Sequence, residues 1–277
     1  MRGAAPFPIE IGGRALEAAR WGGAGAPEIV LLHEGLGSVG LWRDFPAHLA
    51  ARSGRRLFAY SRAGYGQSAS IELPRPLSYM EDEARETLPR ILDAAGARRV
   101  ILLGHSDGAS IAAIHAAGSG VAKTGCVIAG LVLIAPHFFV EDVSVASIAA
   151  AREAYENGDL RARLARHHRD VDAAFRGWNG AWLDPRFRAW RIDDLLPLID
   201  SPVLLIQGEA DEYGTLAQIA TAAAKLPHPP RVMLVPGAGH SPQFSHPERV
   251  IGAVAAFADA VLGRREGALT ASIDGGR

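Results

Sequence analysis

Short apolar runs alternate along the chain with longer stretches in which apolar residues recur at helical spacing. The runs are rich in Val, Ile and Leu and are apolar on both faces, a pattern typical of central strands in a parallel sheet. The pattern predicts eight strands, at residues 7–11, 14–21, 29–32, 57–60, 100–103, 131–134, 203–206 and 232–235. Gly12-Gly13 separates the first two, and this pair suits a two-residue turn with positive φ. The chain therefore opens with a predicted hairpin.

Helical patterns fill the intervals between the later strands. We expect helices near residues 41–52, 79–95 and 247–262, and another that begins near Ser106. Strands that alternate with helices predict an α/β fold, with a mostly parallel central sheet flanked by helices. Catalytic groups in such sheets lie just past the carboxyl ends of the strands.

The stretch 140–195 breaks the alternation. It contains no convincing strand, shows a polar helical pattern such as Arg152–His168, and holds three of the five tryptophans. We expect a helical cap inserted after the sixth strand, over the strand ends. The core would then comprise residues 1–139 and 196–263. We expect the glycine-rich tail, 264–277, to be disordered.

Composition excludes several classes of protein. The chain has 277 residues, of which 48% are apolar, and its net charge of −1 offers nothing to nucleic acid or to an anionic membrane. The single cysteine, Cys126, excludes a disulfide framework and a thiolate zinc site. The longest apolar run, 126–135, is about half of the ~20 residues that a membrane helix needs. We expect a soluble, cytoplasmic monomer or homodimer that uses no metal or organic cofactor.

The strongest chemical signal is Gly104-His105-Ser106-Asp107-Gly108, directly after a strand and directly before a helix. A serine in that position occupies a sharp, strained turn that presents its Oγ above the sheet. The two glycines leave room for the turn. The alternative is a glycine-rich turn in which the serine only caps the helix. The context favours Ser106 as a nucleophile.

A serine hydroxyl needs a base, and the base needs an orienting carboxylate. Asp211 follows the strand 203–206, and His240 follows the strand 232–235, so both lie at strand ends in the order Ser, Asp, His. His228 and His246 are the rivals of His240, one in a proline-rich connector and the other before the last helix. Glu209 and Glu212 are the rivals of Asp211. The expected catalytic residues are Ser106, Asp211 and His240.

Acyl transfer also needs hydrogen-bond donors for the developing oxyanion. The backbone N–H of Asp107 is the first expected donor, at the start of a helix. The second is expected from the loop His33-Glu34-Gly35-Leu36-Gly37, whose glycines allow close approach of a substrate. Gly35 and Leu36 remain equal candidates for it.

These segments resemble the alpha/beta hydrolase superfamily, in its capped branch of small-ester hydrolases, enol-lactonases and cofactor-free C–C bond hydrolases. The resemblance covers about Ile29 to Leu262 outside the cap. Its motifs are the oxyanion loop, Ser61–Ser68, Gly104–Gly108, Gly208–Asp211 and Pro236–His240. It implies the fold and a Ser-His-Asp triad, and says little about the substrate.

Three features of the sequence narrow the choice of activity within this superfamily. The family usually has glycine after the histidine of its oxyanion loop, where this chain has Glu34. The simpler interpretation of Glu34 is a carboxylate that points into the protein and is hydrogen-bonded there. The alternative is that its charge repels anionic substrates or holds a cationic one. Members that cleave halides or epoxides have aspartate in place of Ser106. The C–C hydrolases usually place tryptophan soon after the histidine, where this chain reads Ser241-Pro242-Gln243-Phe244.

The substrate pocket is the least determined part of the site. His137 and Phe138 follow the strand 131–134 and are expected at its mouth, and Trp178 and Trp182 are expected to wall it. At helical spacing the tryptophans could equally form the core of the cap, together with Phe175, Phe187 and Trp190. A histidine at a strand end is also often structural.

The sequence thus predicts a serine hydrolase that cleaves a small carboxyl ester or lactone through an acyl-enzyme. Two alternatives stay open. One is a C–C bond hydrolase of aromatic breakdown, and the other is a hydrolase-like protein that binds a small ligand without turnover.

Overall fold

A single mixed sheet forms the centre of the molecule. The computed structural model describes residues 5–119 and 125–264. The sheet has the strand order β1-β2-β4-β3-β5-β6-β7-β8. Its strands are β1 (Phe7–Ile11), β2 (Arg14–Trp21), β3 (Ile29–Leu32), β4 (Leu57–Tyr60), β5 (Arg99–His105), β6 (Val127–Ile134), β7 (Val203–Gly208) and β8 (Arg231–Val235). Neighbouring strands from β3 to β8 pair in parallel, which confirms the predicted fold class.

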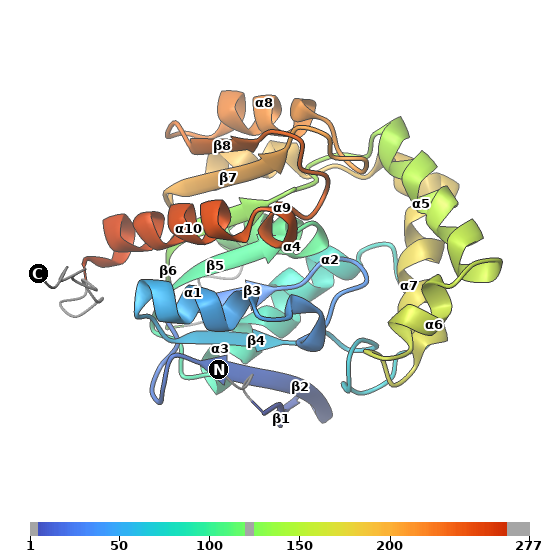
Figure 1. Ribbon diagram of the computed structural model, residues 1–277, viewed down its shortest axis with the longest axis horizontal. Coiled ribbons are helices and arrows are strands. Elements are labelled where there is room, and N and C mark those ends of the chain that lie inside the picture. Colours follow the sequence, from blue (N-terminus) through green and yellow to red (C-terminus); the bar gives the residue numbers. More distant parts are fainter. Residues whose placement is uncertain (1–4, 120–124, 265–277) are drawn as a thin grey trace, which may run out of the picture.

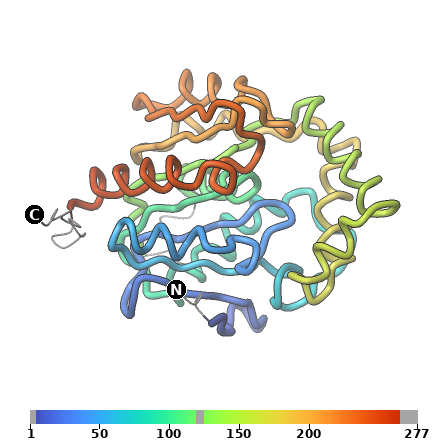
Figure 2. The backbone as a smooth tube through the Cα atoms, in the orientation of Figure 1, coloured from blue at the N-terminus to red at the C-terminus, as the bar shows by residue number. Residues whose placement is uncertain are grey.

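The first two strands form the predicted hairpin at one end of the sheet. Ile11 pairs with Arg14 across the turn, and Gly12 and Gly13 have φ of 59° and 76°. Both values lie in the left-handed region, which glycine adopts without a steric penalty. β2 then pairs antiparallel with β4, so the hairpin lies at the opposite end from β8 (Figure 2).

Alternate residues of each central strand pack on opposite faces of the sheet. In β3, Val30 joins one apolar cluster while Ile29 and Leu31 join the other. Helices α1 (Phe45–Ser53) and α10 (Pro247–Leu262) cover one face (Figure 1). The other face packs against α3 (Leu88–Ala94), α4 (Asp107–Ile114) and α8 (Leu216–Lys225). Because both faces are covered, the strands read as continuous apolar runs.

Two predicted helices differ from the observed elements. The stretch predicted at 79–95 divides into α2 (Tyr79–Asp82), the π-helical η2 (Glu83–Thr87) and α3. Pro89, in the first turn of α3, has no N–H to continue the α-helical hydrogen bonds. The helix predicted near 41–52 begins as the 3-10 turn η1 (Gly40–Trp42), and α1 starts only at Phe45.

Short helices occupy the chain between β6 and β7. They are α5 (Asp142–Glu156), α6 (Leu160–Leu164), α7 (Val171–Trp182), η5 (Pro185–Ala189) and η6 (Asp193–Leu198). Figure 1 shows α5, α6 and α7 gathered along one side of the core, opposite the C-terminal end of α10. The Trp190 Nε1–H donates to Glu81 Oε1, which ties this segment to α2. The ring of Tyr155 stacks on that of Phe175 with centroids 3.7 Å apart, so α5 and α7 share a small core.

Two further expectations concern the chain as a whole. Residues 265–277, nearly all of the tail expected to be disordered, lie outside the described residues. Within the two described ranges, no helix is both long and apolar enough to cross a lipid bilayer.

Candidate active site

Ser106 lies at the sharp turn between β5 and α4. Its φ of 53° and ψ of −119° are strained for a residue with a side chain. A Cβ on Gly104 would lie 2.2 Å from Gly108 O, and one on Gly108 would lie 2.0 Å from Leu32 O. Glycine is therefore required at both positions for the turn to form. Among the described residues Ser106 Oγ has no hydrogen-bond partner, so it is available to another group.

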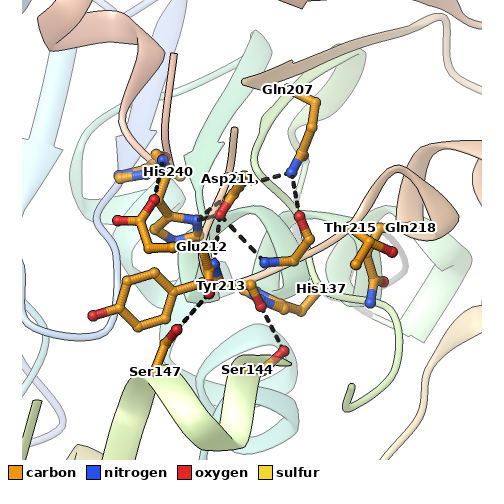
Figure 3. Close-up of polar contacts among 12 residues, drawn as sticks. His137, Ser144, Ser147, Gln207, Asp211, Glu212, Tyr213, Thr215, Gln218 and His240 are labelled. Atoms are coloured by element: carbon orange, nitrogen blue, oxygen red, sulfur yellow. Dashed lines mark hydrogen bonds and ion pairs between the residues drawn. The ribbon is translucent and has the colours of Figure 1, made fainter. Parts of the chain in front are cut away.

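Asp211 and His240 meet at the carboxyl ends of β7 and β8. Nδ1 of His240 lies 2.9 Å from both carboxylate oxygens of Asp211 (Figure 3). The His240 ring is about one-eighth exposed, whereas the Asp211 side chain is buried. A carboxylate only accepts hydrogen bonds, so Nδ1 carries the proton and Nε2 is left as the basic atom.

Three donors besides His240 hold the Asp211 carboxylate in place. Gln207 Nε2 donates to Oδ2 at 2.7 Å, and the backbone N–H groups of Tyr213 and Gly214 donate to Oδ1 at 2.8 and 3.2 Å. Figure 3 shows these groups converging on the one carboxylate. Burial alone raises the pKa of Asp211, but the hydrogen bond and charge of His240 outweigh it and hold the pKa below its ordinary value.

The alternative candidates for the base and for the orienting carboxylate do not take part in this contact. His228 and Glu209 are exposed, and His246 is the residue before α10, with its ring Nδ1 2.9 Å from Ser245 Oγ. Glu212 does approach His240, but its Oε2 accepts the backbone N–H of His240 at 3.1 Å rather than the ring. The structure thus brings Asp211, and none of its rivals, to the ring of His240.

Three backbone carbonyl groups of the loop after β3 are contacted by side chains from other segments. Arg62 donates to His33 O at 2.6 Å and to Glu34 O at 2.9 Å, and the His168 ring lies 2.9 Å from Leu36 O. The N–H groups of Gly35 and Leu36 have no described hydrogen-bond partner, and both residues line the same cavity as Ser106. The geometry leaves both as candidate donors.

The cavity beside Ser106 has a volume of about 200 Å³. It is lined by Glu34, Gly35, Leu36, His105, Ser106, Asp107, His137, Ile148, Trp178, Trp182, Glu212, Tyr213, His240 and Ser241. A larger hollow of about 860 Å³ lies between the hairpin and η2, and Ser106, Asp211 and His240 do not border it. Any chemistry at Ser106 therefore takes place in the smaller cavity.

Some of the residues expected in the substrate pocket line the cavity, and others lie in the protein core. His137, Trp178 and Trp182 line the cavity. Phe138 does not: its side chain is fully buried in the core, so this structure lends no support to its predicted contact with substrate. Successive residues after a strand point in different directions, and here it is His137 that faces the site. Phe175 and Phe187 pack among the helices of the inserted segment instead.

Glu34 combines features of both interpretations of its carboxylate. Its side chain is about one-quarter exposed, and Oε2 lies 3.5 Å from His105 Nδ1. The residue also lines the cavity beside Ser106.

Several residues of the site carried no recognisable sequence signal. Tyr79 Oη donates to Asp107 Oδ2 at 2.5 Å and accepts from Trp182 Nε1 at 3.0 Å. This chain of hydrogen bonds joins α2, the residue after Ser106 and α7. Gln207, at the end of β7, was equally unmarked, although a polar residue closing an apolar strand is a signal that could have been used.

Comparison with known proteins places this geometry in a family. Residues 29–253 match the model of a protein family that is described as "Alpha/beta hydrolase family". The chain belongs to the alpha/beta hydrolase family. Membership of this family supports a hydrolase function.

Known relatives of this alpha/beta hydrolase differ in their chemistry. The chain is 29% identical over 275 residues to the dihydrolipoyllysine-residue acetyltransferase component of the acetoin cleaving system of Pseudomonas putida, covering 92% of this chain and 70% of that relative. Among solved structures it resembles an esterase from Rhodococcus sp., with TM-score 0.68, 22% identity, and coverage of 94% of this chain and 100% of the other. It also resembles the enol-lactonase from Burkholderia xenovorans, with TM-score 0.68, 20% identity, and coverage of 91% and 99%. At these identities the structural likeness concerns the fold.

Proposed function

We propose that this alpha/beta hydrolase is a serine hydrolase that cleaves a small carboxyl ester or lactone. The observation that carries the proposal is the Asp211–His240 pair, which shares one cavity with a serine held at a strained turn. Ser106 is the nucleophile, His240 the general base, and Asp211 the carboxylate that orients the base. The helices of 140–195 act as a cap, because Trp178 and Trp182 close the cavity over Ser106.

The reaction proceeds in two halves. His240 Nε2 takes the proton of Ser106 Oγ as Oγ bonds to the substrate carbonyl carbon. The C–O bond to the leaving group then breaks, and His240 returns the proton to the departing alcohol. Water attacks the acyl-enzyme, giving its proton to His240, and the acid leaves as Oγ regains a proton. The hydrogen bond from Ser106 to His240 forms in the substrate complex, where such contacts tighten.

Backbone donors stabilise the oxyanion in both halves. The N–H of Asp107 lies at the positive end of α4, and the N–H of Gly35 or Leu36 supplies the second hydrogen bond. Arg62 supports this arrangement by holding the loop carbonyls.

The test is hydrolysis of p-nitrophenyl esters, from acetate to decanoate and benzoate, by the wild type and by Ser106→Ala. We expect turnover to peak at one acyl group and to fall by more than about 10³-fold in Ser106→Ala. Ser70→Ala, which changes an exposed serine, is the matched control and should keep full activity. A fluorophosphonate probe should label Ser106, as mass spectrometry of the digested protein can show. Full activity in Ser106→Ala, or failure of both turnover and labelling, would reject the proposal.

A further inference from the structure

The side chains around Ser106 present more negative charge than the proposed reaction requires. Three carboxylates, those of Glu34, Asp107 and Glu212, line the cavity. No lysine or arginine side chain lines it within residues 5–119 and 125–264. The guanidinium of Arg62 lies beside Asp107 with Nη2 3.9 Å from Oδ2, and its Nη1 and Nη2 donate to His33 O and Glu34 O.

Glu34 and Glu212 are the two cavity carboxylates that solvent reaches, and Glu34 is the one beside His105. Burial raises the pKa of Glu34, but hydrogen bonding and charge from His105 outweigh that effect, so its pKa lies below the ordinary value and it is an anion at neutral pH. His105 Nδ1 lies 3.5 Å from Glu34 Oε2 and 3.1 Å from Gln243 Nε2, and His105 Nε2 lies 2.9 Å from His240 O.

Two residues of the cavity lining also contain buried acceptor atoms that lack partners and are closed to solvent. Asp107 Oδ1 and His137 Nδ1 are buried and have no hydrogen bond among the described residues. His137 Nε2 lies 3.1 Å from Tyr213 O, and a carbonyl only accepts, so the ring proton is on Nε2. Burial and the charge of His240 lower the pKa of His137, which keeps the ring neutral. Both unpartnered atoms are therefore acceptors, and an unpaired buried acceptor is costly.

We infer that this cavity selects substrates that carry no carboxylate, with Glu34 as the selecting residue. The charge of Glu34 repels anions and attracts cations. The inference rests on the proposed function, since it names the substrate class of the same site. It separates this chain from hydrolases whose substrates are themselves carboxylic acids.

The test uses binding rather than turnover, so its failure is distinct from failure of the proposed function. Benzylamine, benzamide and benzoate have closely matched sizes and are cationic, neutral and anionic at about pH 8. Their affinities for the intact protein are measured by ligand-observed NMR and by the fluorescence of Trp178 and Trp182. We expect benzylamine and benzamide to bind at least about ten-fold more tightly than benzoate.

Two variants test whether Glu34 is the residue that causes the preference for cationic and neutral ligands. Glu34→Gln should reduce the benzylamine-to-benzoate affinity ratio by about ten-fold. Glu209→Gln, which removes an exposed carboxylate that does not line the cavity, should leave the ratio unchanged. Benzoate binding as tightly as benzylamine, no binding by any of the three, or an unchanged ratio in Glu34→Gln would overturn the inference.

Discussion

Nδ1 of His240 is equidistant, at 2.9 Å, from the two carboxylate oxygens of Asp211. A ring held in this way cannot rotate without losing a charge-assisted hydrogen bond, and its tautomer is fixed with the proton on Nδ1. The basic Nε2 is thereby kept for Ser106. The pair is the relationship on which the rest of the site depends.

Asp211→Asn should lower kcat for ester hydrolysis by about 10³- to 10⁴-fold while the protein remains folded. The amide can donate to Nδ1, which moves the ring proton to Nε2 and removes the base. Steady-state kinetics measure the loss, and ¹⁵N NMR of the His240 ring reports the tautomer. Glu209→Gln, in the same loop but exposed, is the control. A variant with wild-type kcat would show that Asp211 does not orient the base.

Gln207→Leu should reduce kcat by about 10- to 100-fold with little change in KM. Gln207 Nε2 donates to Asp211 Oδ2 and to Gly214 O, so its loss frees the carboxylate and the loop that carries it. Because the lost donor favours the charged form of Asp211, the pKa of Asp211 should rise, and the acid limb of the kcat–pH profile should move to higher pH. A purely structural role would lower the amount of folded enzyme and leave that profile in place. Gln67→Leu, at an exposed position, is the control.

The sequence was sufficient for the fold and for the meeting of Asp211 with His240, because both depend on periodic or local signals. Apolar runs on both faces mark buried strands, and glycines at 104 and 108 mark a turn that tolerates no Cβ. It was insufficient wherever the outcome depends on side-chain direction. Phe138 and His137 are neighbours after one strand, yet only His137 reaches the cavity.

Contacts between distant segments were equally beyond the sequence. Tyr79 lies 28 residues from Asp107 and 103 residues from Trp182, and no local pattern indicates that the three are linked. The orientation of Glu34 depends on His105, which lies on another strand.

Tyr79→Phe should destabilise the protein by about 1–3 kcal/mol, because it removes the donor to the buried Asp107 carboxylate and the acceptor of Trp182 Nε1. Tyr65→Phe is a matched control. The Tyr65 hydroxyl is buried without a hydrogen-bond partner among the described residues, so its removal should leave stability unchanged or raise it. Urea denaturation followed by fluorescence compares the two variants. Equal destabilisation by both would mean that the loss in Tyr79→Phe has no connection with its hydrogen bonds.

Stability should fall as the pH is lowered from about 7.5 to about 5.5. Burial, the largest cause in each case, lowers the pKa of five histidines: His33, His115, His137, His167 and His168. Below the ordinary histidine pKa of about 6.5 the unfolded chain binds protons that the folded chain does not, so stability falls with falling pH. The raised pKa of Glu83 acts in the opposite direction, but it is one group against five. Thermal unfolding at constant ionic strength measures the trend, and a Tm that rose over this interval would contradict it.

Gly35→Ala should lower kcat by about 10²- to 10³-fold, the usual effect of losing one oxyanion donor. A Cβ at this position would lie 2.1 Å from Trp178 Nε1, so either the loop or the tryptophan must move. Gly180→Ala is the control: it lies in α7, is exposed, and its Cβ would meet nothing within 4 Å, so it should stabilise the helix by about 0.5–1 kcal/mol and leave kcat unchanged. Trp178→Ala added to Gly35→Ala should recover part of the lost kcat, since it removes the ring that the new methyl group displaces. A wild-type kcat in Gly35→Ala would show that the methyl group displaces the tryptophan and not the loop, which would contradict this prediction.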